Sequence, residues 1–218
     1  MDPDSPTARW QRRTELLLTA ASLAFLGSYA FLVLAHGASD AWRGVALCVL
    51  LAAWAAFAVD YGVRWRLSGR RFGFARSHWL DTLVLVLPLL RPLRIVRIYE
   101  AVQHRRGGPR LSLHARVVAY AGLSASLLGF TGALAVYQQE RGAPGANMRT
   151  FGDALWWACS TLSTVGYGDI VPVTTGGRVV AAAMMACGLG LLGAVTGSFS
   201  SWLLQVFARG DEDGPPAR

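Results

Sequence analysis

A glycine-rich stretch that follows residue 160 carries the most specific chemistry in this sequence. Residues 161–169 read Thr-Leu-Ser-Thr-Val-Gly-Tyr-Gly-Asp. Because Gly166 and Gly168 adopt positive φ without steric cost, the carbonyls of residues 164–167 can all be turned to one side of the chain. Four copies around an axis would form stacked rings of oxygen atoms, with the Thr164 hydroxyls as a further ring at the inner end. Such rings replace the hydration shell of a potassium ion, so the stretch predicts potassium binding at these carbonyls.

This irregular stretch also constrains its surroundings. Non-helical backbone is tolerated at membrane depth only where it lines a pore or is buried in protein. One such segment per chain cannot close a ring, so fourfold assembly is implied, most simply as a homotetramer.

The composition predicts a membrane protein. Of the 218 residues, 53% are hydrophobic and only 16% are charged, against about 25% charged residues in a soluble domain. Runs with few or no charges, read as membrane spans of about 20 residues, stand at 16–35, 45–59, 117–137 and 179–207. The sequence therefore predicts an all-α, multi-pass membrane protein in contact with lipids, and it excludes a secreted, disordered or fibrous chain.

The chain divides at Gly107-Gly108-Pro109, because proline cannot continue a helix. Before this break we expect four helical segments, at 15–35, 41–63, 79–90 and 91–104. After it we expect an outer helix at 113–137, a half-length segment at 151–162 and a last span at 177–207. The predicted organisation is a cytoplasmic lead (1–14), a four-segment domain (15–106), a linker (107–112), a pore domain (113–208) and a short cytoplasmic tail (209–218).

The charge pattern predicts orientation. The net charge is +8, and all 21 basic residues are arginines that cluster between apolar runs, as in loops that face the cytoplasm. Counting them places both termini in the cytoplasm of a cell-membrane protein and argues against a nucleic-acid partner. The first apolar run exceeds the 7–15 residues typical of a secretion signal, so we expect it to be retained. We read Cys48, Cys159 and Cys187 as small buried apolar residues.

The half-length segment before the glycine-rich stretch is predicted to be a re-entrant helix. Thr150-Phe151-Gly152-Asp153 has the spacing of a capping box, so the helix should start there. Twelve residues reach only about 18 Å, which is too short to cross a bilayer. The carboxyl end of this helix would point at the pore axis and favour a cation.

Residues 154–169 and Pro172 closely resemble the pore of potassium channels, and the resemblance covers about 95 residues strongly. It implies a four-helix, voltage-sensor-like bundle followed by a two-helix pore module with a re-entrant pore helix. The implied selectivity filter comprises Thr164, Val165, Gly166, Tyr167 and Gly168. No cofactor is implied apart from the permeant potassium ions.

The same resemblance implies residues that support the filter: Trp156, Trp157, Ser160 and Asp169. In the family, a tryptophan in the position of Trp156 donates to an acid in the position of Asp169. Some bacterial relatives have glutamate where this chain has Ser160, which puts acid-dependent inactivation of that type in doubt.

Gly188 in the last span resembles the hinge of the inner helix in this family. Glycines also recur at positions 190, 193 and 197, and small residues permit close helix packing. The sequence therefore allows two roles for Gly188, a gate hinge or a simple packing site.

Arg91, Arg94 and Arg97 recur at every third residue among apolar neighbours. One interpretation is a basic helix that lies on the cytoplasmic surface, and the other is a helix that moves in the transmembrane field. The series stops at Glu100, so any voltage dependence should be shallower than in relatives with longer arginine runs.

The partners of these arginines resemble those of a voltage sensor. By that resemblance, Phe57 is the plug that gating charges pass, and Asp60 and Asp81 are their countercharges. A solvated helix end remains the alternative for either acid.

The predicted function is a potassium-selective, voltage-gated channel. The alternatives are a channel whose first four segments are only a scaffold and a non-conducting channel-like subunit. No cluster of catalytic groups predicts an enzyme.

Overall fold

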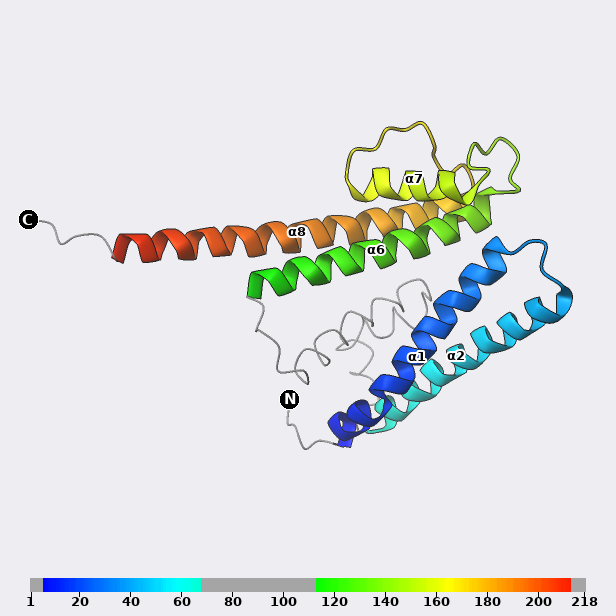
Figure 1. The fold of residues 1–218 in the computed structure, drawn as a ribbon, viewed down its shortest axis with the longest axis horizontal. Coiled ribbons are helices and arrows are strands. Elements are labelled where there is room, and N and C mark those ends of the chain that lie inside the picture. The colour runs from blue at the N-terminus through cyan, green and yellow to red at the C-terminus, as the bar shows by residue number, and fades with distance from the viewer. Residues whose placement is uncertain (1–5, 68–112, 213–218) are drawn as a thin grey trace, which may run out of the picture.

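The computed structural model describes residues 6–67 and 113–212, and all regular structure in these two stretches is helical. The helices are, in chain order, α1 (Pro6–Leu34), α2 (Asp40–Leu67), α6 (Leu113–Glu140), α7 (Phe151–Leu162) and α8 (Thr175–Glu212) (Figure 1). Each of them except α7 is long and apolar enough to cross a membrane. The chain is therefore an all-α membrane protein, as its composition predicts. The segments expected at 79–90 and 91–104 lie outside the described residues, and Asp81, Arg91, Arg94 and Arg97 lie there with them.

The helix bounds extend beyond the predicted spans. The bounds of α7 are those predicted, whereas α1 begins at Pro6 instead of near residue 15 and α8 continues to Glu212 instead of residue 207. The prediction ended each span with its apolar run. A helix outside hydrocarbon can continue through polar residues, and the fixed φ of proline suits the first helical position at Pro6.

The described helices form two groups. α1 and α2 are joined by a short loop and pack against each other, while α8 runs along α6 and α7 lies over one end of that pair (Figure 1). The two groups meet where the loop after α1 reaches the end of α6. There the ring of His36 meets Tyr137 edge-on at 6.3 Å between centroids. Tyr137 in turn contacts Phe151 at the start of α7, at 6.2 Å.

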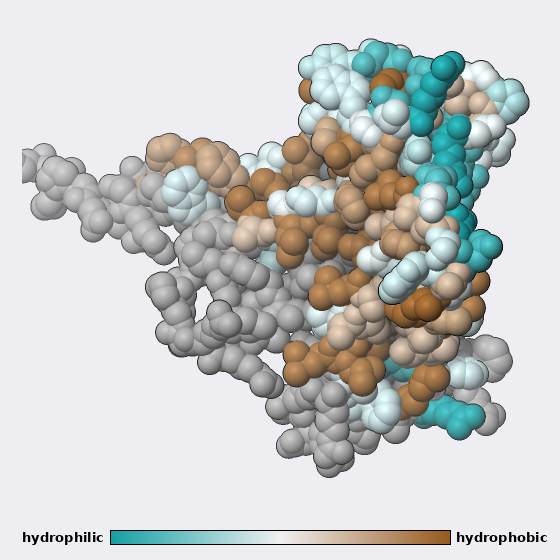
Figure 2. All heavy atoms as spheres, turned by 45° about the vertical axis from the view of Figure 1, so that its right-hand side comes forward, coloured by the Kyte–Doolittle hydropathy of each residue, from teal (hydrophilic) through white to brown (hydrophobic). Residues whose placement is uncertain are grey.

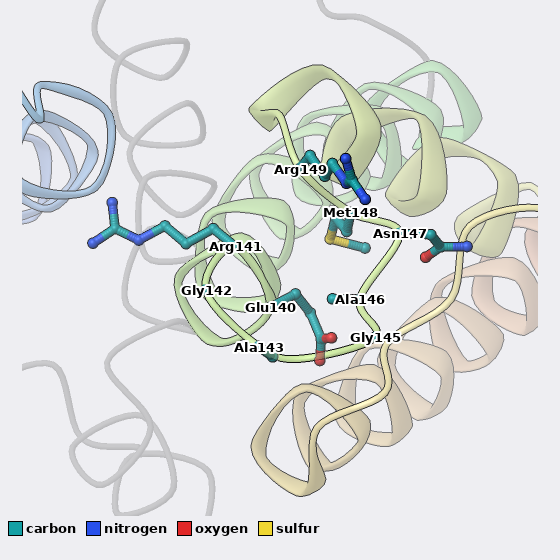
Figure 3. A pocket seen from close by; sticks show the side chains of 9 residues that line it. All are labelled: Glu140, Arg141, Gly142, Ala143, Gly145, Ala146, Asn147, Met148 and Arg149. Carbon is teal, nitrogen blue, oxygen red and sulfur yellow. The ribbon is translucent and has the colours of Figure 1, made fainter.

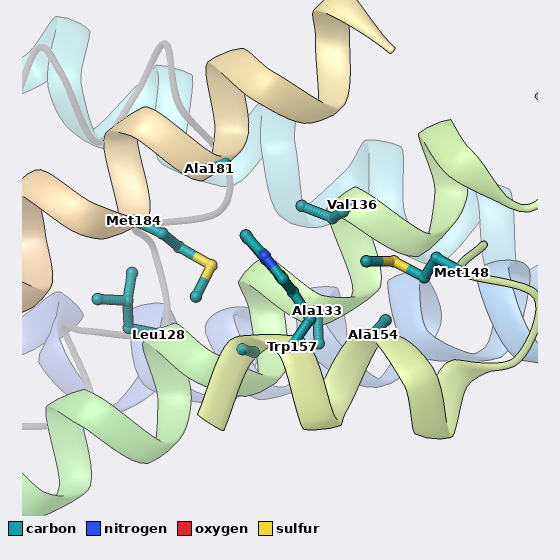
Figure 4. Close-up of a cluster of buried hydrophobic side chains, with 9 residues drawn as sticks. Leu128, Ala133, Val136, Met148, Ala154, Trp157, Ala181 and Met184 are labelled. Atoms are coloured by element: carbon teal, nitrogen blue, oxygen red, sulfur yellow. The ribbon is translucent and has the colours of Figure 1, made fainter. Parts of the chain in front are cut away.

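The main core lies between α6, α7 and α8. It contains Leu128, Ala133, Val136, Met148, Ala154, Trp157, Ala158, Ala181 and Met184 (Figure 4). Among the described residues, a separate buried cluster of Phe25, Ala53 and Phe57 joins α1 to α2. Trp157 is therefore a core residue, with only 4% of its surface exposed, and it fixes α7 against the two long helices.

The outer surface of the described chain is largely apolar. Figure 2 shows hydrophobic atoms over most of the helix flanks in view, with hydrophilic atoms gathered along one edge. Large side chains such as Leu47, Trp54 and Leu189 are exposed. Patches of this extent mark membrane or subunit contacts.

The prediction that all three cysteines are buried is wrong, since Cys48 and Cys159 lie on outward faces of α2 and α7 and are exposed.

Glycines allow α6, α7 and α8 to approach closely. A Cβ at Gly132 of α6 would lie 2.8 Å from Met184 Cγ of α8, and closer still to its sulfur. Leu162, the last residue of α7, faces Gly188, where a Cβ would lie 2.9 Å from Leu162 Cδ2, and Gly129, where it would lie 3.1 Å from Cδ1. Gly188 is therefore a packing site, and α8 runs through it as an unbroken helix.

We predict that Gly132→Ala destabilises the protein. The added methyl group overlaps the buried Met184 side chain, and overpacking of this kind costs about 1–3 kcal/mol. Gly122→Ala is the matched control, because nothing lies within 4 Å of a Cβ there. Thermal unfolding of the purified protein in detergent should show a lower midpoint for Gly132→Ala only. Equal midpoints for the two variants would contradict the packing described here.

Candidate functional site

The backbone between α7 and α8 alternates in handedness along the predicted filter. Thr164, Gly166 and Gly168 have φ of 61°, 58° and 74°, and Val165 and Tyr167 between them do not share the positive sign. The two glycines thus adopt the predicted conformation. Thr164 was not predicted to do so, and a non-glycine residue in this region costs about 1–3 kcal/mol. Because φ changes sign from each residue to the next, the carbonyls of successive peptides point to the same side of the chain.

Ser160 on the last turn of α7 holds two of these peptide planes. Its carbonyl accepts from Gly166 N at 3.0 Å. Its hydroxyl accepts from Tyr167 N at 3.1 Å. The C=O of a trans peptide points away from the N–H of the same peptide. The carbonyls of Val165 and Gly166 are therefore directed away from α7, toward the open side of the loop.

Trp156 supports the loop from its outer end. Its Nε1 donates to Asp169 Oδ2 at 2.8 Å, so the pairing implied by the family resemblance is present. The Trp156 ring also stacks on Tyr167, with centroids 5.4 Å apart and planes 4° from parallel. Asp169 Oδ1 accepts from Ile170 N at 3.0 Å, so both carboxylate oxygens are used.

α7 begins at the predicted capping box. Thr150 Oγ1 accepts from Asp153 N at 3.2 Å. Asp153 Oδ2 accepts from Thr150 N at 2.8 Å and from Arg149 N at 2.9 Å. The backbone hydrogen bonds from Thr150 and Arg149 hold the pKa of the Asp153 carboxyl below its usual value. The carboxylate therefore stays charged at the amino end of α7, where the helix dipole favours it.

The loop before α7 borders an open pocket lined by residues 140–143 and 145–149 (Figure 3). Met148 from this loop is fully buried in the main core. In Figure 3 the side chain of Arg141 points away from the loop, and that of Glu140 points across its base toward Ala143 and Gly145. The loop is thus attached to the core at Met148 and to the start of α8 through Glu140, which the sequence analysis did not single out.

Glu140 ends α6 and holds the segment that leads into α8. Its carboxylate accepts from Val173 N at 3.0 Å, from Thr174 N at 2.9 Å and from Thr174 Oγ1 at 2.6 Å. The side chain is completely buried. A Cβ at Gly177 would collide with Glu140 Oε1, so only glycine allows α8 to start this close to α6.

The described part of the first module places Phe57 and Asp60 on one face of α2. Phe57 packs with Phe25 of α1. Asp60 is only 4% exposed and accepts from Trp10 Nε1 at 3.2 Å. Asp60 is therefore a buried, hydrogen-bonded acid and not a solvated helix end. Nothing in the residue pattern indicates Trp10 as its partner.

Several known proteins are similar in sequence to this chain. Residues 124–205 match the family described as ion channel. A cyclic nucleotide-gated potassium channel of Mesorhizobium japonicum is 30% identical over 191 residues, which cover 77% of this chain and 52% of that protein. A voltage-gated potassium channel of Aeropyrum pernix is 40% identical over 75 residues, covering 34% of this chain and 25% of the relative. The chain belongs to a family of potassium channels.

A further relative is named for a different role. A human voltage-gated potassium channel regulatory subunit is 34% identical over 131 residues, which cover 57% of this chain and 25% of that protein. The chain spans about half the length of the Mesorhizobium relative and about a quarter of the other two.

We predict that Glu140→Gln loosens the start of α8. The amide keeps one acceptor oxygen but turns an NH₂ group toward backbone N–H donors, and a buried donor left unsatisfied costs about 1–3 kcal/mol. Thermal unfolding of the purified protein should show a lower midpoint. Gln138→Ala, an exposed position on the same turn of α6, should leave the midpoint unchanged. A wild-type midpoint in Glu140→Gln would show that the second carboxylate oxygen contributes nothing to stability.

Proposed function

We propose that the chain forms a homotetrameric, potassium-selective channel of the cell membrane, with both termini in the cytoplasm. The filter comprises Thr164, Val165, Gly166, Tyr167 and Gly168. The observation that carries the proposal is the alternating handedness of these residues, with two of their N–H groups turned toward Ser160. The relatives named above, which are ion channels and not enzymes, add support.

The proposed mechanism uses the backbone as a substitute for water. Four copies of residues 164–167 surround a dehydrated potassium ion with carbonyl oxygens, and the Thr164 hydroxyls add the innermost ring. The carboxyl end of α7 lies next to this segment, and its partial negative charge favours a cation. No bound cofactor is needed besides the permeant ion.

We further propose that the first module confers voltage dependence. Arg91, Arg94 and Arg97 would be the gating charges, and Phe57, Asp60 and Asp81 the residues they pass. The burial of Asp60, to which Trp10 of α1 donates, supports this, because ionisable residues buried within membrane helices typically pair with other charges. Three arginines in each of four subunits give 12 charges, worth at most about 28 kcal/mol per 100 mV at about 2.3 kcal/mol each.

A second candidate is a non-conducting subunit. It is favoured by the human relative, which is named as a regulatory subunit. The complete filter segment and its supports at Ser160, Trp156 and Glu140 favour conduction instead. Ion flux distinguishes the two functions directly.

We predict that liposomes containing the purified protein conduct potassium in preference to sodium and are blocked by barium. Gly166→Ala should abolish this flux, because its φ of 58° is strained for any residue with a Cβ. Gly142→Ala is the control, since this exposed glycine has neither a positive φ nor a close neighbour. Absence of wild-type flux would favour the non-conducting subunit. A reversal potential that ignores the exchange of sodium for potassium would refute selectivity.

We predict that Arg94→Gln makes the conductance–voltage curve shallower in planar bilayers, because it removes a third of the proposed gating charge. Arg43→Gln removes a cation outside the series and should at most shift the curve without changing its slope. An unchanged curve in Arg94→Gln would favour the scaffold role for the first four segments.

A further inference from the structure

Asn147 connects the loop before α7 to the chain that leaves the proposed filter. Its Nδ2 donates to the backbone oxygen of Asp169 at 2.7 Å. Its Oδ1 accepts from Val171 N at 3.4 Å. Both ends of one amide are thus used on two backbone groups that lie 22 and 24 residues away. A carboxylate could accept from Val171 but would repel the Asp169 oxygen.

Apart from the Trp156 ring that stacks on Tyr167, the outer end of the proposed filter has few packing contacts within one chain. Val165 and Tyr167 are exposed, and nothing lies within 4 Å of a Cβ built at Gly168. The bonds to Asp169 from Trp156 and Ile170 act on the side chain. Asn147 acts on the main chain instead, one peptide beyond Gly168. It therefore restrains the direction in which the backbone leaves the filter.

Resting on the proposed function, we propose that Asn147 is a positioning residue that fixes the outermost carbonyl ring and thereby raises the affinity of the filter for potassium. When the Asp169 carbonyl is released, the backbone of Tyr167 and Gly168 can widen. The outer oxygen atoms then fit a dehydrated ion less well. Bound potassium would resist this widening, so loss of the amide should matter most when potassium is scarce.

The test measures the potassium concentration that gives half of the maximal thermal protection of the purified tetramer, with sodium keeping the ionic strength constant. A ligand that binds only the folded state stabilises it according to its dissociation constant. Asn147→Leu has nearly the size of asparagine and no amide. This variant should require about fivefold more potassium for half-maximal protection, which corresponds to the free energy of about one hydrogen bond. At saturating potassium it should have the melting temperature of the wild type.

Two further variants serve as controls. Gln138→Leu makes the same chemical change at another exposed position and should match wild type. Asn147→Ala repeats the test without added bulk, in case the leucine variant fails to assemble. A melting point lowered equally at every potassium concentration, or an unchanged potassium requirement, would overturn the role of Asn147 alone. A wild-type tetramer that potassium does not protect would overturn the proposed function and this role with it.

Discussion

A backbone whose handedness alternates from residue to residue has no repeating hydrogen-bond ladder of its own. Residues 164–168 are in this state, and their conformation must be supported from outside the segment. Ser160 supplies an acceptor on its carbonyl and another on its hydroxyl, and Trp156 holds the far end through Asp169. These contacts direct carbonyls into open space, where an unpaired carbonyl at membrane depth would be costly. That cost is relieved when the carbonyls surround a cation.

The helices around this segment are arranged to keep α7 in place. α7 is anchored at its amino end by the capping box and along its length by Trp157 in the main core. At its carboxyl end Leu162 lies between Gly129 and Gly188, so the base of the filter rests on both long helices. Gly188 thus serves helix packing. This was one of the two roles, packing site or hinge, that the sequence left open for it. A bend there would have to move Leu162 as well.

Much of the site could be predicted because its signals are local. The glycines, the capping box and the bounds of α7 follow from residue types within 20 positions of one another. Glu140 and Asn147 were missed because their partners are backbone groups 22 to 34 residues away, which leave no trace in residue type. Trp10 was missed for a related reason. A tryptophan beside an apolar span is typical of a membrane-interface anchor, and Asp60, which accepts its hydrogen bond, lies 50 residues away.

Phe57 belongs to the buried cluster that joins α1 to α2, and Asp60 lies one helical turn further along α2. This acid is buried, and the Trp10 indole of α1 donates to one of its oxygens. Under the proposed voltage dependence, an approaching arginine would compete with Trp10 for Asp60, so the end of α1 would take part in setting the resting position of the sensor.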